Sequence, residues 1–245
     1  MAPGGYAWWY LDALSDDGRF GLVLIAFIGS VFSPYYAWAR ARAPGGRADP
    51  HRHVAINIAL YTPGGGPGAR WAMTERGAGA LQRDAQTFTV GPSALHWDGQ
   101  ALQITLDERC APIPRRLRGR LRLHPQGPGL AAPLALDAAG EHQWWPIAPG
   151  ARLEVDLTEP GWRWQGPAYL DSNRGVVPLE RSFASWQWAR AALDGGRSAV
   201  AYDAVQADGT ERRIALAFDG RGGFSTLADM PMQPLPKTPV FRVPR

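Results

Sequence analysis

The sequence predicts an all-β protein, and three observations support this fold class. Short apolar segments recur along the 245 residues, and most are bounded by Gly, Pro or Asp. Glycine and proline are abundant, with 29 and 22 residues, which suits many short strands joined by turns. No long segment has the periodicity of an amphipathic helix. The spacing of the segments is typical of a sandwich or a barrel.

The first half of the chain contains most of the expected strands. Residues 8–14 and 19–28 are predicted to form a hairpin around the Asp-Gly turn of residues 15–18. Residues 33–40 predict an aromatic-rich loop or a short helical turn. Further strands are expected at residues 54–61, 70–76, 87–90, 94–97 and 102–106.

Residues 20–39 carry no charge and are the one candidate for a membrane span. Their strongly apolar part, residues 22–28, is only seven residues long. Because a transmembrane helix needs about 20 predominantly apolar residues, we expect a buried strand followed by a loop. The chain begins without a basic region followed by an apolar run and a cleavage pattern, so no signal peptide is expected.

Residues 116–123 alternate between arginine on one face and mainly leucine on the other, which predicts a half-buried strand with a basic outer row. The simpler interpretation of this row is a solvated face, and the functional alternative is docking to anionic lipid headgroups. The remaining strands are expected at residues 152–157, from residue 162 onward, and at 185–193, 198–205 and 211–218, the last three as a meander.

Composition narrows the classes of partner. The net charge is +4, a mild basic bias compatible with an anionic surface. Nucleic-acid binding is not expected, because no aromatic residues interleave with the arginine row. The single cysteine, Cys110, excludes an intramolecular disulfide and slightly favours a reducing compartment.

Two sets of polar residues are candidates for a functional site, one for metal binding and one for glycoside hydrolysis. Asp49, His51 and His53 would share one face of an extended segment, but no further ligand motif is near, so structural or solvent roles are favoured and no metal is expected. Glu75, Asp171 and Glu180 would suit glycoside hydrolysis if two of them met in space, although the sequence gives no distance. The glycine-rich residues 63–68 lack the Lys-Ser/Thr of a phosphate-binding loop.

Residues 169–175, Tyr-Leu-Asp-Ser-Asn-Arg-Gly, read as a polar turn with one acid at its centre. Asp-Ser-Asn in a turn most often caps its own backbone. Aromatic residues flank the segment in sequence, and a carboxylic acid among them would also suit acid chemistry on an apolar substrate. These residues are Trp144, Trp145, Trp162, Trp164, Phe183, Trp186 and Trp188.

Five segments together resemble the carotenoid 1,2-hydratase family, also called hydroxyneurosporene synthases. They are residues 7–10, 26–40, 70–77, 169–173 and 185–190, and they occur in family order over nearly the whole chain. The resemblance implies two lipocalin-like antiparallel β domains, residues 1–165 and 166–245. Family members usually continue past Arg245, so the second domain is expected to be incomplete.

The resemblance also implies a function. The expected reaction is the cofactor-free addition of water to the terminal C1–C2 double bond of an acyclic carotenoid, such as neurosporene or lycopene. The expected location is the cytoplasm, in peripheral contact with a bacterial photosynthetic membrane. The alternatives are a related acid-catalysed terpenoid cyclase and a lipocalin-like carrier that binds a lipophile without chemistry.

The proton donor proposed for the family falls on Asp171, with Tyr169 and Trp144 as supporting residues. An apolar pocket can raise a carboxyl pKa by about 3–5 units, which would keep Asp171 protonated as a general acid. The Trp144 ring would stabilise the cation formed at C1. Candidates for a polyene-binding tunnel, for each of which a core role is an equal alternative, are Tyr35, Trp38, Trp186 and Trp188.

Overall fold

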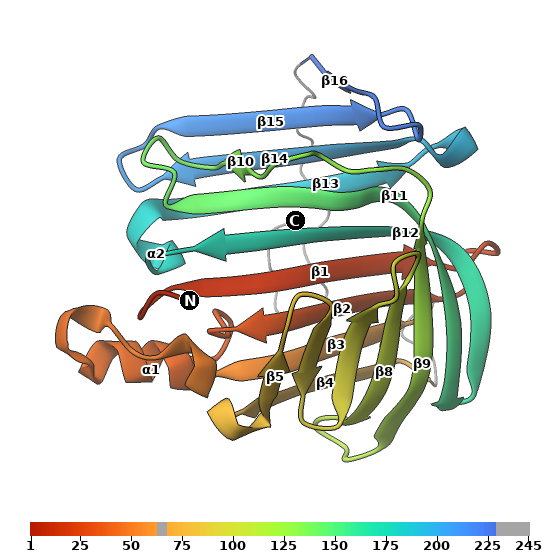
Figure 1. Cartoon of the computed structure of the whole chain (residues 1–245), viewed down its shortest axis with the longest axis horizontal. Helices are drawn as coiled ribbons and strands as arrows, with labels where there is room; N and C mark the ends of the chain where they lie inside the picture. Colours follow the sequence, from red (N-terminus) through yellow and green to blue (C-terminus); the bar gives the residue numbers. More distant parts are fainter. Residues whose placement is uncertain (63–67, 229–245) are drawn as a thin grey trace.

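The computed structural model describes residues 1–62 and 68–228, and it confirms the all-β fold class. Two antiparallel sheets make up the described part of the chain (Figure 1). Two predicted features lie outside the described residues. They are most of the glycine-rich loop, at residues 63–67, and the chain end at residues 229–245, where the second domain is expected to be incomplete.

The larger sheet spans the first three quarters of the sequence. Its strands in chain order are β1 (Tyr6–Leu14), β2 (Gly21–Ile28), β3 (Val54–Tyr61), β4 (Arg70–Arg76), β5 (Leu81–Arg83), β6 (Thr87–Val90), β7 (Ser93–Trp97), β8 (Leu102–Arg109), β9 (Arg116–Pro125), β10 (Leu134–Ala135), β11 (His142–Glu159) and β12 (Trp162–Gly175). Their spatial order is β4-β3-β2-β1-β12-β11-β9-β8-β7-β6-β5, with β10 beside β11.

The smaller sheet follows as a meander of β13 (Phe183–Ala192), β14 (Ser198–Gln206), β15 (Glu211–Phe218) and β16 (Phe224–Thr226). The helical segments are α1 (Pro34–Arg42), α2 (Leu179–Ser182) and the short 3-10 turns η1 (Pro44–Gly46), η2 (Pro50–Arg52), η4 (Ala78–Ala80) and η5 (Asp194–Gly196). The expected domain boundary between residues 165 and 166 falls inside β12, whereas the two sheets part after Gly175. The division into two domains stays a prediction.

Most of the predicted strands are confirmed. β1 and β2 form the expected antiparallel hairpin, and β3, β4 and β6 have the predicted bounds. Residues 33–40 form the start of α1, where the Ser33 hydroxyl accepts a hydrogen bond from the Tyr35 N–H and Pro34 occupies the first turn.

The first half of β11 was not predicted, because Pro146, Pro149 and Gly150 resemble strand breakers in the sequence. The strand tolerates them through two register shifts against β12, on either side of Ala148. Such bulges bend a strand without ending it.

The turn predicted at residues 169–175 is wrong. These residues form the second half of β12, which pairs with β1 on one side and β11 on the other. A strand with two neighbours uses its backbone groups in the sheet, so no side-chain cap is needed. Gly175 serves close packing rather than a turn, since a Cβ there would lie 2.5 Å from the Tyr6 ring.

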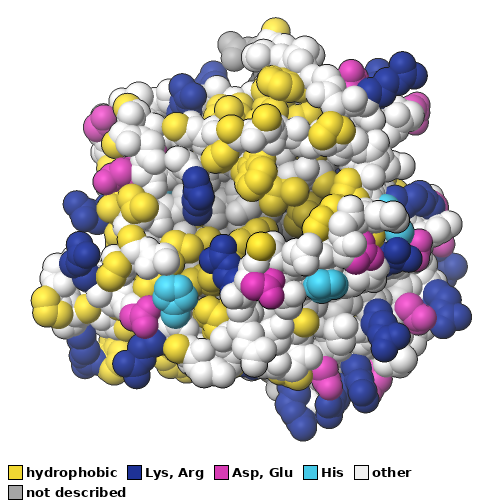
Figure 2. Space-filling view, viewed as in Figure 1, with side chains coloured by type: hydrophobic (Ala, Val, Ile, Leu, Met, Phe, Trp, Pro, Cys, Tyr) yellow, Lys and Arg dark blue, Asp and Glu magenta, His cyan; other side chains and the backbone are white. Residues whose placement is uncertain are grey.

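The larger sheet has a hydrophobic core on each of its faces. One face curls around a core that includes Leu24, Ile56 and Leu121, and Figure 1 shows β5, β8 and β9 in front of β2, β3 and β4. The opposite face of β1, β2, β11 and β12 packs against the smaller sheet, and this second core includes Trp144 and Tyr202. Hydrophobic side chains are visible between the two sheets in Figure 2.

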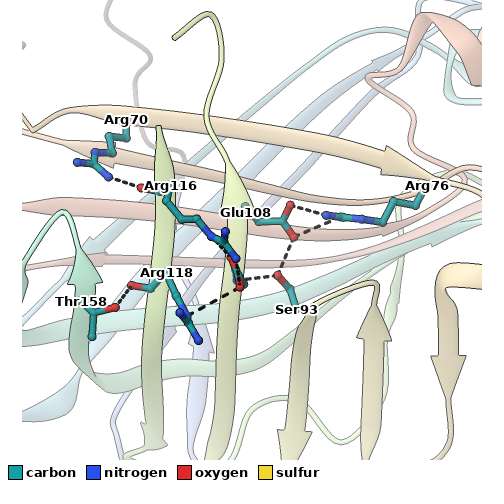
Figure 3. Close-up of polar contacts among 8 residues, drawn as sticks. Arg70, Arg76, Ser93, Glu108, Arg116, Arg118 and Thr158 are labelled. Carbon is teal, nitrogen blue, oxygen red and sulfur yellow. Dashed lines mark hydrogen bonds and ion pairs between the residues drawn. The ribbon is translucent and has the colours of Figure 1, made fainter. Parts of the chain in front are cut away.

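The basic row predicted at residues 116–123 is confirmed on β9, where Leu117, Leu121 and Leu123 are buried and the arginines face outward. Part of its charge is balanced locally. Arg116 lies 2.7 Å from an oxygen of Asp107 on β8, and Arg118 lies 3.8 Å from the other (Figure 3).

A separate ion pair lies deeper in the first core. The Glu108 carboxylate, which is fully buried, accepts hydrogen bonds from Arg76 at 2.8 Å and from Ser93 at 2.6 Å (Figure 3). A buried carboxylate with these partners is structurally satisfied.

The uncharged segment at residues 20–39 is not one helix. It contains the buried strand β2, then a loop, then most of α1, as predicted for its first part. Within residues 1–62 and 68–228, no helix combines the length and the hydropathy that a membrane span requires.

Candidate active site

Asp171, Tyr169 and Trp144 meet in the core between the two sheets. Tyr169 and Asp171 alternate on β12 and therefore share one face. Trp144 reaches the same face from β11, where its backbone lies opposite Asn173. The exposed fractions of the three residues are 3% for Asp171 and 0% for both aromatic residues, so the acid is largely shielded from bulk water.

The two oxygens of Asp171 have different surroundings. Oδ2 accepts hydrogen bonds from the Trp144 indole N–H at 2.8 Å and from the Tyr169 hydroxyl at 2.9 Å. Oδ1 is buried, and no group among the described residues hydrogen-bonds to it. A proton on this carboxyl group therefore belongs on Oδ1, the oxygen that no protein donor occupies.

Burial raises the pKa of Asp171 from 3.8 to about 7. The hydrogen bonds from Trp144 and Tyr169 act in the opposite direction, since they favour the charged form, and the negative charge of Asp12 adds a smaller upward contribution. Asp171 is thus a carboxylic acid with a substantial protonated fraction near neutral pH, as a general acid requires.

Aromatic rings from both sheets surround the acid. The Trp188 ring on β13 lies 5.2 Å from the Tyr169 ring and 5.1 Å from the Tyr10 ring. The Tyr202 ring on β14 lies 5.4 Å from the Trp144 ring. The negative faces of such rings favour a nearby cation, by up to about 2 kcal/mol when water is excluded.

His142 is a buried polar residue near the site that the sequence analysis did not identify. It lies two positions before Trp144 on β11, fully buried, with its Nδ1 atom 2.8 Å from the Tyr6 hydroxyl. Burial lowers the pKa of His142, which favours the neutral imidazole. His142 and Trp144 are two positions apart, and this spacing in a strand would have predicted that both side chains lie on one face.

A cleft of about 690 Å³ opens between the end of β1, the start of β2 and the end of β13, and Asp171 itself does not line it. Tyr10 and Trp188 line it, and both contact Tyr169, whose hydroxyl binds Asp171. The rings of Tyr10, Trp188 and Tyr169 therefore separate the cleft from Asp171. Its apolar lining includes Leu14, Phe20, Leu22, Val23, Ala191 and Ala192.

The structure brings only one of the four predicted substrate-binding residues to this cleft, namely Trp188. Trp186 lies two residues before it on β13, with an exposed fraction of 38%. Tyr35 and Trp38 lie on α1 and are 68% and 61% exposed, and neither lines the cleft. α1 is anchored near the start of β1, where Tyr36 donates to the Gly5 carbonyl. A substrate-binding role for Tyr35, Trp38 and Trp186 stays a prediction.

The other polar candidates lie elsewhere. Glu75 hydrogen-bonds to His53 at 2.6 Å, and β4 is four strands from β12, about 19 Å along the sheet at the usual strand spacing. Glu180 pairs with Arg40. The structure thus does not support a carboxylate pair between Asp171 and Glu75. Asp49 hydrogen-bonds to the neighbouring His51, and in the described part of the chain no group of three or more His, Cys, Asp or Glu side chains is arranged to hold a metal.

Comparisons with known proteins show the family of this chain. Residues 24–245 match the model of the family described as carotenoid hydratase CrtC. The whole chain is 50% identical to the acyclic carotenoid 1,2-hydratase of Rubrivivax gelatinosus, covering 59% of that protein. It is also 50% identical to the protein of the same name from Thiocapsa roseopersicina, covering 58%.

A solved structure supports the fold alone. The crystal structure of a Nitrosomonas europaea protein provisionally named AttH superposes with a TM-score of 0.70 at 16% identity, over 97% of this chain and 73% of that one. The chain spans less than two thirds of the length of the two curated relatives. On the family match and the full-length identity, the chain belongs to the carotenoid hydratase family CrtC.

Proposed function

We propose that this protein adds water to the terminal C1–C2 double bond of an acyclic carotenoid, with Asp171 as the proton donor. The observation that carries the proposal is the state of Asp171, a buried acid with a pKa near 7 and one oxygen to which no described residue hydrogen-bonds. Family membership and the names of the two relatives support the choice of reaction.

The geometry suits an acid-catalysed route. The proton on Oδ1 is transferred to C2, the π electrons form the new C–H bond, and a tertiary cation is left at C1. The rings of Trp144, Tyr169 and Trp188 would stabilise that cation. The hydrogen bonds from Trp144 and Tyr169 to Oδ2 stabilise the carboxylate that remains on Asp171. Water then adds to C1 and loses a proton.

The product formed from lycopene tests this proposal. Incubation in water enriched in oxygen-18, followed by mass spectrometry of the extracted pigment, should give a hydroxylated carotenoid carrying the label. An isomeric cyclic product would instead support a terpenoid cyclase. Unchanged pigment that stays bound to the protein would support a carrier and contradict both enzymatic functions.

Replacing Tyr169 with phenylalanine is expected to weaken Asp171 as an acid. The hydroxyl hydrogen-bonds to Oδ2 and favours the ionised form, so its loss should raise the pKa of Asp171 further. A hydrogen bond to a charged group contributes about 1.5–3 kcal/mol, which corresponds to a shift of about one to two pH units. The rate–pH profile should move to higher pH, while the rate at its plateau falls. An unchanged profile would contradict the assigned hydrogen bond.

We also propose peripheral contact with an anionic membrane surface, from the cytoplasmic side, because an apolar substrate resides in lipid. Arg118 and Arg120 on the outer face of β9 are exposed and are candidates for headgroup contact. Each basic side chain near such a surface contributes about 1 kcal/mol, so replacing both with glutamine should weaken binding to anionic vesicles roughly 30-fold at low salt. Arg213→Gln, on β15, is the control. Binding that does not depend on salt would contradict this role.

A further inference from the structure

A buried ion pair joins the two sheets at the inner end of the cleft. The Arg190 guanidinium on β13 donates to Asp12 on β1, with 2.5 Å between Nε and Oδ1, and the Tyr10 hydroxyl donates to Oδ2 at 3.1 Å. The Arg190 and Asp12 side chains are only 9% and 13% exposed. The mechanism above uses neither charge, although both residues line the cleft.

Asp12 lies on the same face of the sheet as Asp171. On the paired strands β1 and β12, Asp12 is directly opposite Tyr169, and Tyr10 is directly opposite Asp171. The two carboxyl groups are therefore diagonal neighbours, a relation that places side chains about 7–8 Å apart. A comparable separation, about 6.5–9.5 Å, lets the acid and base of inverting glycosidases hold a water molecule between them.

Several polar residues line the cleft, among them Asp12, Arg190, Arg19 and Thr62. Its remaining lining is mainly apolar, and the indole N–H of Trp188 is buried without a hydrogen-bond partner among the described residues. Asp12 supplies an acceptor, and Arg190 and Trp188 supply donors. An ordered water molecule typically needs two to four such partners. This end of the cleft thus meets the requirements of a water site next to Asp12.

We propose that Asp12 is the residue that holds the nucleophilic water and takes its proton, with Arg190 and Trp188 positioning the same water. The inference rests on the proposed function. After Asp171 protonates C2, a lone pair of the water forms the bond to C1. One water O–H bond then breaks, and its proton passes to the Asp12 carboxylate. Water bonded to a carbocation is a strong acid, so an ion-paired carboxylate is a sufficient base. The proton returns to Asp171 through solvent in the cleft, and the sum is alkene plus water giving alcohol.

The two half-reactions can be measured separately in D₂O. Protonation of C2 without capture of water is reversible and leaves deuterium in recovered lycopene, whereas hydration gives the alcohol. In Asp12→Asn, Asp171 still protonates the substrate, but the cation lacks its base. The ratio of alcohol to deuterated lycopene should fall by about 100-fold or more relative to the wild type. Because both products need protonated Asp171, the ratio is insensitive to any change in the protonation of that residue.

Three further variants complete the test. The double variant Asp12→Asn/Arg190→Gln removes both charges of the ion pair. It can therefore be measured even if the unpaired Arg190 prevents the single variant Asp12→Asn from folding. The same fall in the ratio of alcohol to deuterated lycopene is expected. Asp107→Asn, at an ion pair on β8 that does not line the cleft, should keep the wild-type ratio. Asp171→Asn should form neither product. Folding of each variant is checked by circular dichroism.

An unchanged ratio in a folded Asp12→Asn protein would overturn the inference and leave a purely structural ion pair, while the proposed function would stand. A wild type that forms neither alcohol nor deuterated lycopene would overturn both.

Discussion

Replacing Asp171 with asparagine is expected to lower the hydration rate by about 10²–10⁴-fold, the contribution typical of a general acid. Asparagine has nearly the same shape, and its amide oxygen can still accept the hydrogen bonds from Trp144 and Tyr169. The variant therefore removes the acidic proton while it keeps the packing between the sheets. Product formation from lycopene, measured under single-turnover conditions, checks the result.

Asp203→Asn is the matched control for this experiment. Asp203 lies on β14 of the smaller sheet and pairs with Arg213 rather than with the site. Its substitution should leave the hydration rate within a fewfold of the wild type. Full activity of Asp171→Asn would mean that another group delivers the proton.

The stability of the folded protein should fall as the pH rises through neutrality. Because burial raises the pKa of Asp171 from 3.8 to about 7, the folded state binds a proton that the unfolded state has already released between these values. This contribution is fully present below about pH 4 and is lost as the pH rises through about 7. A shift of this size corresponds to a change on the order of 4 kcal/mol in the free energy of unfolding.

Urea titrations of the wild type and of Asp171→Asn at a series of pH values isolate this effect. The lowered pKa of His142 acts in the opposite direction in part of the same range, and it is common to both proteins. The difference in unfolding free energy, wild type minus variant, should therefore decrease from pH 5 to pH 8. A difference that does not change with pH would show that Asp171 ionises normally in the fold.

The sequence was sufficient to predict strands whose residue pattern shows by itself that they are buried or half-buried. β9 was predicted because its alternation of arginine and leucine reports which face is buried, and β3 because it is a short apolar run with β-branched residues. The sequence also drew attention to Asp171, through the aromatic residues around it and the family resemblance. It misread residues 169–175 as a turn, because Asp, Ser, Asn and Gly favour turns and only pairing on both sides keeps them extended.

The partners of the acid depend on contacts between distant segments. Tyr10 lies opposite Asp171, and Arg190 reaches Asp12 across 178 positions of sequence. No local sequence pattern reveals how β1 pairs with β12, so the position of Asp12 near Asp171 was not predicted. Tyr35 and Trp38 lie within the family-like segment 26–40, but the sequence could not show that they are exposed on α1 rather than beside the cleft.

A titration of the Asp171 carboxyl group tests directly whether this residue can donate a proton at neutral pH. Protein labelled with carbon-13 at the aspartate side-chain carboxyl carbon can be followed by NMR, and Asp171→Asn identifies the signal by its loss. We expect a midpoint near pH 7, well above that of an exposed aspartate. A signal that titrates near pH 4 would contradict it, because Asp171 would then have no proton to donate at neutral pH.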